Sequence, residues 1–142
     1  YRDLMDGALH FAFVKGEPAT EAEVMVRVHV ENVLTDVLRL ERGDLGISLS
    51  QALAAIQEAE AGIVVVLSGQ PSAETVLARL QGTMTEVSPD GPAQWRRNGV
   101  GAQILADLGA HKLRVLGTQR RQVALAGFGL EIVGYAEPRH DR

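Results

Sequence analysis

The chain has 142 residues, no cysteine and a formal net charge of −4. This length suits one domain with a full hydrophobic core, and the lack of cysteine excludes disulfides, thiolate nucleophiles and zinc sites built on sulfur. The acidic balance argues against binding to nucleic acid or to an anionic membrane, because both need a clustered basic surplus.

Two strands are predicted near the start of the chain. Residues 9–16 alternate in polarity and end at Lys-Gly, and residues 24–30, with the sequence VMVRVHV, alternate strictly. We expect an antiparallel strand pair joined by the polar loop 17–23. One face of the second strand would carry its valines, and the other would carry Met25 and the polar residues that follow it at every second position.

These polar residues are Arg27, His29 and Glu31, and they lead into Asp36. They could form a ligand-binding face, or they could be the water-exposed side of a strand pair. The His29-x-Glu31 spacing also occurs in zinc deaminases, but that signature needs a downstream cysteine pair. The deaminase interpretation is therefore rejected.

From residue 48 onward, helical and apolar patterns alternate. The expected helices cover 48–62, 72–82, 93–109 and, as a short piece, 120–127, and the expected strands cover 63–67, 112–117 and 130–135. We predict that Ser48 or Ser50 caps the first helix and that Gly62 ends it. The run IVVVL is typical of a strand buried on both faces. The chain is thus predicted to be α/β, with a mostly parallel or mixed sheet flanked by helices.

Other polar motifs give weaker signals. The segment 68–72, SGQPS, follows the buried strand but has one glycine and a proline, so we interpret it as a turn rather than a phosphate loop. The doublets Arg96-Arg97 and Arg120-Arg121 are either solvated surface or an anion site. The four histidines are far apart in sequence, without the spacing of a metal site.

Three stretches together resemble the GTP cyclohydrolase II domain of riboflavin biosynthesis: VRVHVENVLTDVLRLERGDLGISLSQAL, NGVGAQILADLGAHKLRVL and GFGLEIV. The opening YRDLMDGALHFAFVKG resembles the entry to that domain where it is fused behind 3,4-dihydroxy-2-butanone 4-phosphate synthase. The resemblance implies a single GTP cyclohydrolase II-like domain over residues 1–142, which we expect to be part of a longer fusion protein in the cytoplasm.

The family enzyme opens the imidazole ring of GTP and releases formate and pyrophosphate. Its zinc ion is held by three cysteines, and this zinc activates water. In this sequence the three ligand positions are Asn32, Gly43 and Leu45. Glycine and leucine have no side-chain ligand atom, so the resemblance implies that zinc is lost and that no cofactor is expected.

Other family positions are also changed. The family's Gln after the last cysteine is Ser48, and its guanine-reading and phosphate-binding loop aligns with 68–72, with Gln70 at the position of the Glu. The proposed general base is replaced by Gln94, whereas the Arg proposed to accept the phosphoryl group is retained as Arg96. We expect no cyclohydrolase activity from this domain.

Three functions follow from these expectations. The first is a degenerate, non-catalytic domain that stabilises, dimerises or regulates a fused synthase, in a homodimer of the kind common in the family. The second is a regulatory module that binds a nucleotide or another phosphorylated ligand through Arg27, Arg96 and Arg120 or Arg121. The third, least favoured, is an active enzyme: either residual cyclohydrolase with another metal held by His29, Glu31 and Asp36, or a new activity.

Overall fold

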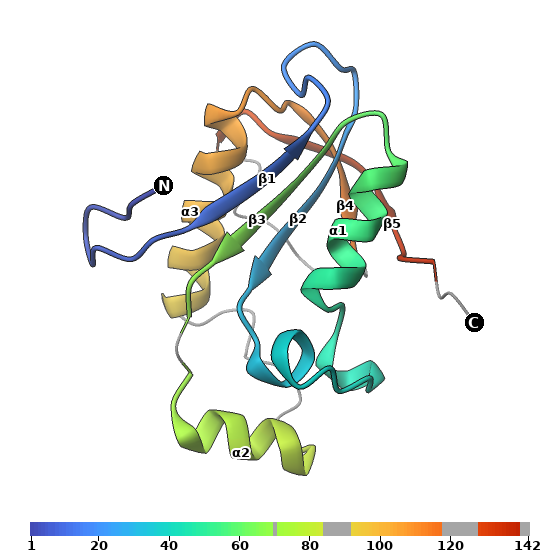
Figure 1. Cartoon of the computed structure of the whole chain (residues 1–142). Helices are drawn as coiled ribbons and strands as arrows, with labels where there is room; N and C mark the ends of the chain where they lie inside the picture. Colours follow the sequence, from blue (N-terminus) through green and yellow to red (C-terminus); the bar gives the residue numbers. More distant parts are fainter. Residues whose placement is uncertain (70, 84–91, 118–127, 140–142) are drawn as a thin grey trace.

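The computed structural model describes residues 1–69, 71–83, 92–117 and 128–139. Five strands form one sheet in the order β1-β3-β2-β4-β5 (Figure 1). The strands are β1 (Phe11–Lys15), β2 (Val24–Val30), β3 (Gly62–Leu67), β4 (Lys112–Leu116) and β5 (Glu131–Ala136). The helices are α1 (Leu49–Glu58), α2 (Ala73–Gln81) and α3 (Pro92–Asp107), with two single turns, η1 (Val33–Val37) and η2 (Gly43–Leu45).

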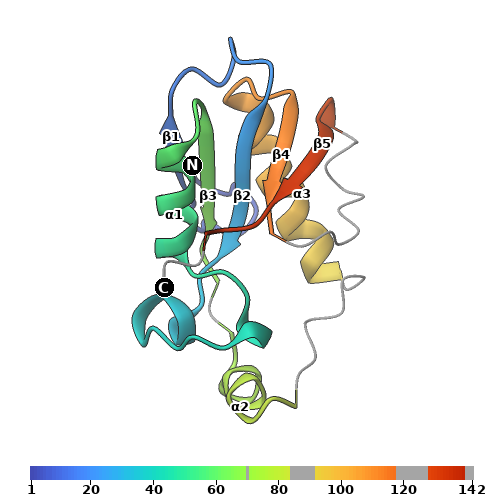
Figure 2. The same cartoon turned by 90° about the vertical axis from the view of Figure 1, so that its right-hand side faces the viewer.

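The sheet lies between two helices, with α1 on one face and α3 on the other (Figure 2). All residues of β3 are buried, which confirms the prediction of a strand covered on both faces. On the α3 side, Ala102 and Leu105 pack against Val65, and on the α1 side, Ala52 and Ile56 pack with Val64. These two clusters make the fold α/β, as predicted.

The pairing of the N-terminal strands differs from the prediction. β1 runs antiparallel, but its partner is β3, and β3 separates it from β2. The other neighbouring strands pair in parallel. The fully apolar β3 takes the interior position, and the long polar loop 16–23 does not impose the tight hairpin that would pair the two earlier strands. Met25, Arg27 and His29 of β2 therefore lie on the face of the sheet that α1 covers.

Helix boundaries follow local signals. Ser48 forms a capping box with Gln51, so of the two predicted caps Ser48 is used. The prediction that Gly62 ends α1 is wrong, because the helix stops at Glu58 and Gly62 begins β3. A Cβ at Gly62 would lie 2.7 Å from the Cβ of Ile56, so glycine lets the strand pass close beneath the helix.

The helices predicted over 72–82 and 93–109 are confirmed as α2 and α3, with small differences at their ends. The short helix predicted over 120–127 lies outside the described residues. No helix in the described part of the chain has the length and apolar character needed to cross a membrane.

Candidate functional site

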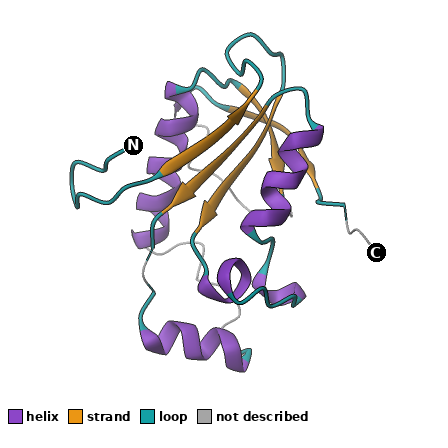
Figure 3. Cartoon of the chain, in the orientation of Figure 1, coloured by secondary structure: helices purple, strands orange, loops and turns teal. Residues whose placement is uncertain are grey.

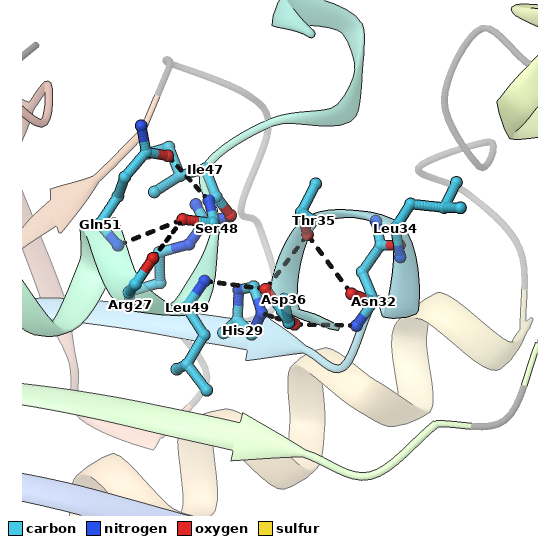
Figure 4. A network of polar contacts seen from close by, with 11 residues as sticks. Arg27, His29, Asn32, Leu34, Thr35, Asp36, Ile47, Ser48, Leu49 and Gln51 are labelled. Carbon is cyan, nitrogen blue, oxygen red and sulfur yellow. Dashed lines mark hydrogen bonds and ion pairs between the residues drawn. The ribbon is translucent and has the colours of Figure 1, made fainter. Parts of the chain in front are cut away.

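The predicted polar face of β2 forms a hydrogen-bonded network with the segment that follows it (Figure 4). His29 is 3% exposed, and its Nε2 lies 2.7 Å from Oδ2 of Asp36 in η1. Because an ionised carboxylate only accepts hydrogen bonds, Nε2 is the donor. His29 and Asp36 thus form a buried pair joining β2 to η1.

Asp36 also accepts hydrogen bonds from three further groups. Its Oδ2 accepts from the backbone N–H of Asn32 at 3.0 Å, and its Oδ1 accepts from the N–H of Leu49 at 2.9 Å and from Thr35 Oγ1 at 3.1 Å. This one carboxylate connects the end of β2, η1 and the first turn of α1.

The electrostatics of Asp36 follow from these contacts. Burial acts to raise the pKa of Asp36, but hydrogen bonds from His29, Leu49 and Asn32 and the Coulombic attraction of His29 outweigh it. The pKa of Asp36 therefore lies below its ordinary value. The ionised carboxylate is therefore favoured, and its role is to accept hydrogen bonds.

Arg27 connects β2 to the end of β4 and to the segment before α1. Its Nη1 donates to the carbonyl of Leu116 at 3.1 Å, and its Nη2 donates to the carbonyl of Ile47 at 3.5 Å. Burial lowers the pKa of Arg27, and the charge of Asp36 acts in the opposite direction. Two buried nitrogens, Nε of Arg27 and Nδ1 of His29, have no hydrogen-bond partner among the described residues.

A cavity of about 600 Å³ opens beside Arg27. It lies between the 39–43 loop, the start of α1 and the end of β4. The lining includes the side chains of Arg39, Glu41, Arg42, Ser48, Ser50, Gln51 and Glu137, with Gly43, Gly46 and Gly117. Positive and negative groups are both present, and the capped first turn of α1 forms part of the wall.

Arg42 at the rim has its hydrogen-bonding capacity largely satisfied. Its Nε and Nη2 bind the two carboxylate oxygens of Asp44 at 2.9 and 2.7 Å. Its Nη1 and Nη2 also donate to the carbonyls of Leu80 and Arg79 at the end of α2, at 2.9 and 2.7 Å. The pair with Asp44 raises the pKa of Arg42. Arg42 therefore attaches the loop to α2.

The residues at the aligned zinc positions have other structural roles or no ligand atom. The Oδ1 of Asn32 accepts from the N–H of Leu34 at 3.1 Å and caps η1. Gly43 lines the cavity, and Leu45 ends η2. Zinc bound in the family's way needs three thiolates, and this chain has no cysteine. The residues present do not fit that metal site.

The structure brings only part of the predicted site together. Arg27 and His29 lie under α1, whereas Glu31 is exposed just beyond β2 and makes no side-chain contact with the Asp36 network. Gln94 and Arg96 lie in α3, but their side chains are outside the described part of the structure. Gln70, Arg120 and Arg121 also lie outside the described residues.

Sequence reasoning missed some of the arrangement. From the sequence, Asp36 is expected only as a residue after the strand and as a ligand in the least favoured metal site. Its position as acceptor for four groups depends on α1 returning beside η1. Arg39 was not predicted at all. It lines the cavity and has a φ of 55°, which is uncommon for a residue with a side chain. No local sequence signal identifies either feature.

Comparison with known proteins supports the resemblance. The family profile described as GTP cyclohydrolase II matches residues 1–137. The chain is 39% identical over 142 residues to a Neisseria meningitidis protein named 3,4-dihydroxy-2-butanone 4-phosphate synthase, covering 96% of this chain and 37% of that protein. It is 34% identical to a Pseudomonas aeruginosa protein of the same name, and the match covers 95% of this chain and 37% of that protein.

A third relative is the riboflavin biosynthesis protein RibBA of Chlorobium phaeovibrioides, 34% identical over 146 residues, with 94% of this chain and 35% of that protein covered. The chain thus spans a little over a third of the length of these relatives. The profile match covers nearly all of the described fold. On this evidence, the chain belongs to the GTP cyclohydrolase II family.

Proposed function

We propose that this chain is a GTP cyclohydrolase II-family domain without cyclohydrolase activity, which stabilises or regulates 3,4-dihydroxy-2-butanone 4-phosphate synthase in riboflavin biosynthesis. The observation that carries the proposal is the set of residues at the three zinc positions. Asn32 is used as a helix cap, and Gly43 and Leu45 offer no side-chain ligand. Without the metal, no group activates water for attack on the ring carbon of GTP.

The contacts of Arg27, His29 and Asp36 support a structural role. Arg27, His29 and Asp36 hold β2, β4, η1 and α1 together through buried hydrogen bonds. This function needs no metal and no substrate. The relatives named as the synthase also contain a matching region, and about two thirds of each of those proteins lies outside it.

Loss of the cyclohydrolase reaction is tested by incubating the chain with GTP and zinc or magnesium and measuring formate. We expect none above the protein-free control. Formate release that needs added metal, and that is abolished by Arg27→Ala in a folded variant, would show that a working enzyme remains.

The supporting role needs a second assay. The chain is joined to a 3,4-dihydroxy-2-butanone 4-phosphate synthase, and the thermal stability and ribulose 5-phosphate turnover of the product are compared with those of the synthase alone. We expect a change in at least one of them. Identical stability, turnover and oligomeric state with and without the chain would contradict the proposal.

The cavity favours a second function, binding of a nucleotide or another phosphorylated ligand. Its volume of about 600 Å³ lies in the range of small-molecule sites, and Arg27 and Arg39 contribute positive charge to its wall. Calorimetric titration with GTP and with ribulose 5-phosphate tests this. Saturable binding heat that becomes weaker in Arg39→Ala would support a ligand-regulated domain. No binding heat at millimolar ligand would rule out this second function.

A further inference from the structure

The first residues of the chain pair with the residues that lead into β1. The N–H of His10 donates to the carbonyl of Tyr1 at 2.8 Å, and the amino group of Tyr1 donates to the carbonyl of His10 at 2.9 Å. The next pair, Arg2 and Leu9, forms an antiparallel bridge. A pair that exchanges both hydrogen bonds, followed by a pair without them, is the pattern of an antiparallel ladder.

A tight turn connects the two sides of this ladder. The N–H of Asp3 donates to the carbonyl of Ala8 at 2.8 Å, and the N–H of Gly7 donates to the carbonyl of Asp3 at 2.8 Å. The side chain of Asp3 accepts from the N–H of Met5 at 2.8 Å, and that of Asp6 accepts from the N–H of Ala8 at 2.9 Å. Residues 1–10 therefore form a hairpin, which we call the N-terminal hairpin, and its second side continues as β1.

The first side of the N-terminal hairpin covers the outer side of the chain only as far as His10. Ser68 Oγ donates to the carbonyl of Leu9 at 2.7 Å, so Leu9 faces β3 and His10 faces outward. Successive residues of a strand direct their backbone groups to opposite edges, so Ala12 and Val14 also face outward. Neither residue has a hydrogen bond on that side within the described part of the chain.

The side chains along this outer edge are also exposed. Among the described strands β1 pairs only with β3 and forms the margin of the sheet (Figure 3). Phe11, Phe13 and Val14 are 54%, 46% and 45% exposed. Proteins protect edge strands with charges, proline or a covering segment. In β1 there is no proline, and Lys15 at its end is the one charged residue. A covering segment is therefore expected.

We propose that the residues preceding Tyr1 in the longer polypeptide continue the N-terminal hairpin as a strand along the outer edge of β1. The pairing of Tyr1 with His10 fixes the register of this strand. The residue just before Tyr1 lies opposite Phe11, the second before it lies opposite Ala12, and the fourth lies opposite Val14. The second and fourth residues then supply partners for the outward N–H and C=O groups of β1.

The chain's relatives provide the source of this strand. The matched region is 37% of the length of the relatives named as the synthase, and the resemblance is to a domain fused behind that enzyme. A preceding segment is already positioned at Tyr1, so its pairing with β1 closes no new loop. The amino nitrogen of Tyr1 becomes a backbone N–H in a longer chain and can keep its bond to His10.

The side chain of Tyr1 shows which face the new residues share. Its hydroxyl donates to Oδ2 of Asp107 at the end of α3, at 2.7 Å. Ala12 packs against the core cluster on the same side of the sheet. Because side chains alternate along a strand, the second and fourth residues before Tyr1 would also face α3. We expect these two positions to be apolar.

The domain would then be joined to the preceding region by a strand of its own sheet and not by a flexible linker. This explains how it could stabilise a synthase, and that consequence rests on the proposed function. The strand itself does not depend on the loss of cyclohydrolase activity.

Hydrogen exchange followed at single residues by NMR tests the proposal. The present chain is compared with the same chain carrying the residues that precede Tyr1 in its own gene product. We expect the amides of Ala12 and Val14 to exchange at least ~10 times more slowly in the extended chain. The amides of Phe11 and Phe13 face β3 in both chains, so they are the internal control and should change much less.

Proline at two neighbouring upstream positions gives a matched pair of variants. At the second position before Tyr1, proline removes an N–H and places its ring against the carbonyl of Ala12, so the protection of Ala12 should be lost. At the third position, opposite Phe13, the N–H points away from β1, and proline should leave most of the protection. Circular dichroism confirms that both variants are folded.

Three results would overturn the proposal. The first is equal exchange of Ala12 and Val14 in the two chains, and the second is an equal effect of the two prolines. The third is protection of these amides in the present chain that rises with concentration, which would assign the edge to a second copy. None of these measurements involves GTP or ribulose 5-phosphate, so failure of the proposed function would leave their outcome unchanged.

Discussion

Asp36 accepts hydrogen bonds from more groups than an amide could satisfy. Its two oxygens serve the side chains of His29 and Thr35 and the backbone N–H groups of Asn32 and Leu49. In Asp36→Asn one oxygen becomes an NH₂ group that faces donors, leaving buried groups unpaired. We expect a loss of about 2–4 kcal/mol in the free energy of unfolding, measured by urea denaturation.

The matched control is Asp44→Asn. Asp44 is also a carboxylate close to a cation, but it is exposed and pairs only with Arg42 on the surface. Surface ion pairs contribute little, so the urea midpoint should change far less than in Asp36→Asn. Equal shifts in the two variants would show that the buried network is not a special source of stability.

The depressed pKa of Asp36 also predicts a pH dependence. A carboxyl whose pKa is lower in the folded state stabilises the fold above its unfolded pKa and loses that contribution as the pH falls through the folded value. The ordinary value is 3.8. The stability difference between the unmodified chain and Asp36→Asn should therefore narrow as the pH falls below 3.8. Urea titrations across this range check it, and a difference that widens with acid would contradict the assignment.

At the scale of elements, α2 depends on one side chain from a distant loop. None of its residues is buried, and Arg42 donates to the carbonyls of Arg79 and Leu80 at its end. In Arg42→Ala we expect the amides of α2 to exchange hydrogen at least ~10 times faster, with β3 unchanged. The measurement is hydrogen exchange followed by mass spectrometry.

Arg39→Ala is the matched control for this prediction. Arg39 carries the same charge in the same loop, but its guanidinium makes no hydrogen bond to the described residues. The exchange of α2 should stay close to that of the unmodified chain. If both variants loosen α2 equally, the effect comes from loop charge and not from the bonds of Arg42.

The elements could be predicted where their signals are local. The Ser48 cap and the apolar run of β3 lie within a few residues of the structures they form, and both are confirmed. The partner of β1 could not be predicted in this way, because strand pairing joins residues far apart in sequence. The burial of His29 likewise depends on α1, which begins twenty residues later. Glu31 does not join the buried polar network, because β2 ends at Val30.

At the scale of the whole molecule, we propose that hydrogen bonds connect the parts of the fold without a metal. The Asp36 network and the contacts of Arg27 already join β2, β4, η1 and α1. We therefore expect neither zinc nor a chelator to change the melting temperature of the unmodified chain. Zinc-dependent stabilisation would contradict the proposed loss of the metal.

If the backbone around Asn32, Gly43 and Leu45 has kept the family's geometry, restoring the three cysteines should restore zinc binding. In the variant Asn32→Cys/Gly43→Cys/Leu45→Cys, a Cβ at Gly43 meets no atom within 4 Å, so the loop accepts the side chain. Zinc at ~1,000 times its dissociation constant adds about 4 kcal/mol, which should raise the melting temperature by about 10 °C. Thermal unfolding with zinc and with chelator measures this.

The double variant Gly43→Cys/Leu45→Cys is the control, because it keeps the cap at Asn32 and lacks one thiolate. It should bind zinc at least ~100 times more weakly than the triple variant. A triple variant that does not bind zinc would mean that the backbone of these loops differs from the family's geometry, and not only the side chains. Zinc binding without formate release would instead show that the other changed positions, Gln94 among them, also prevent the reaction.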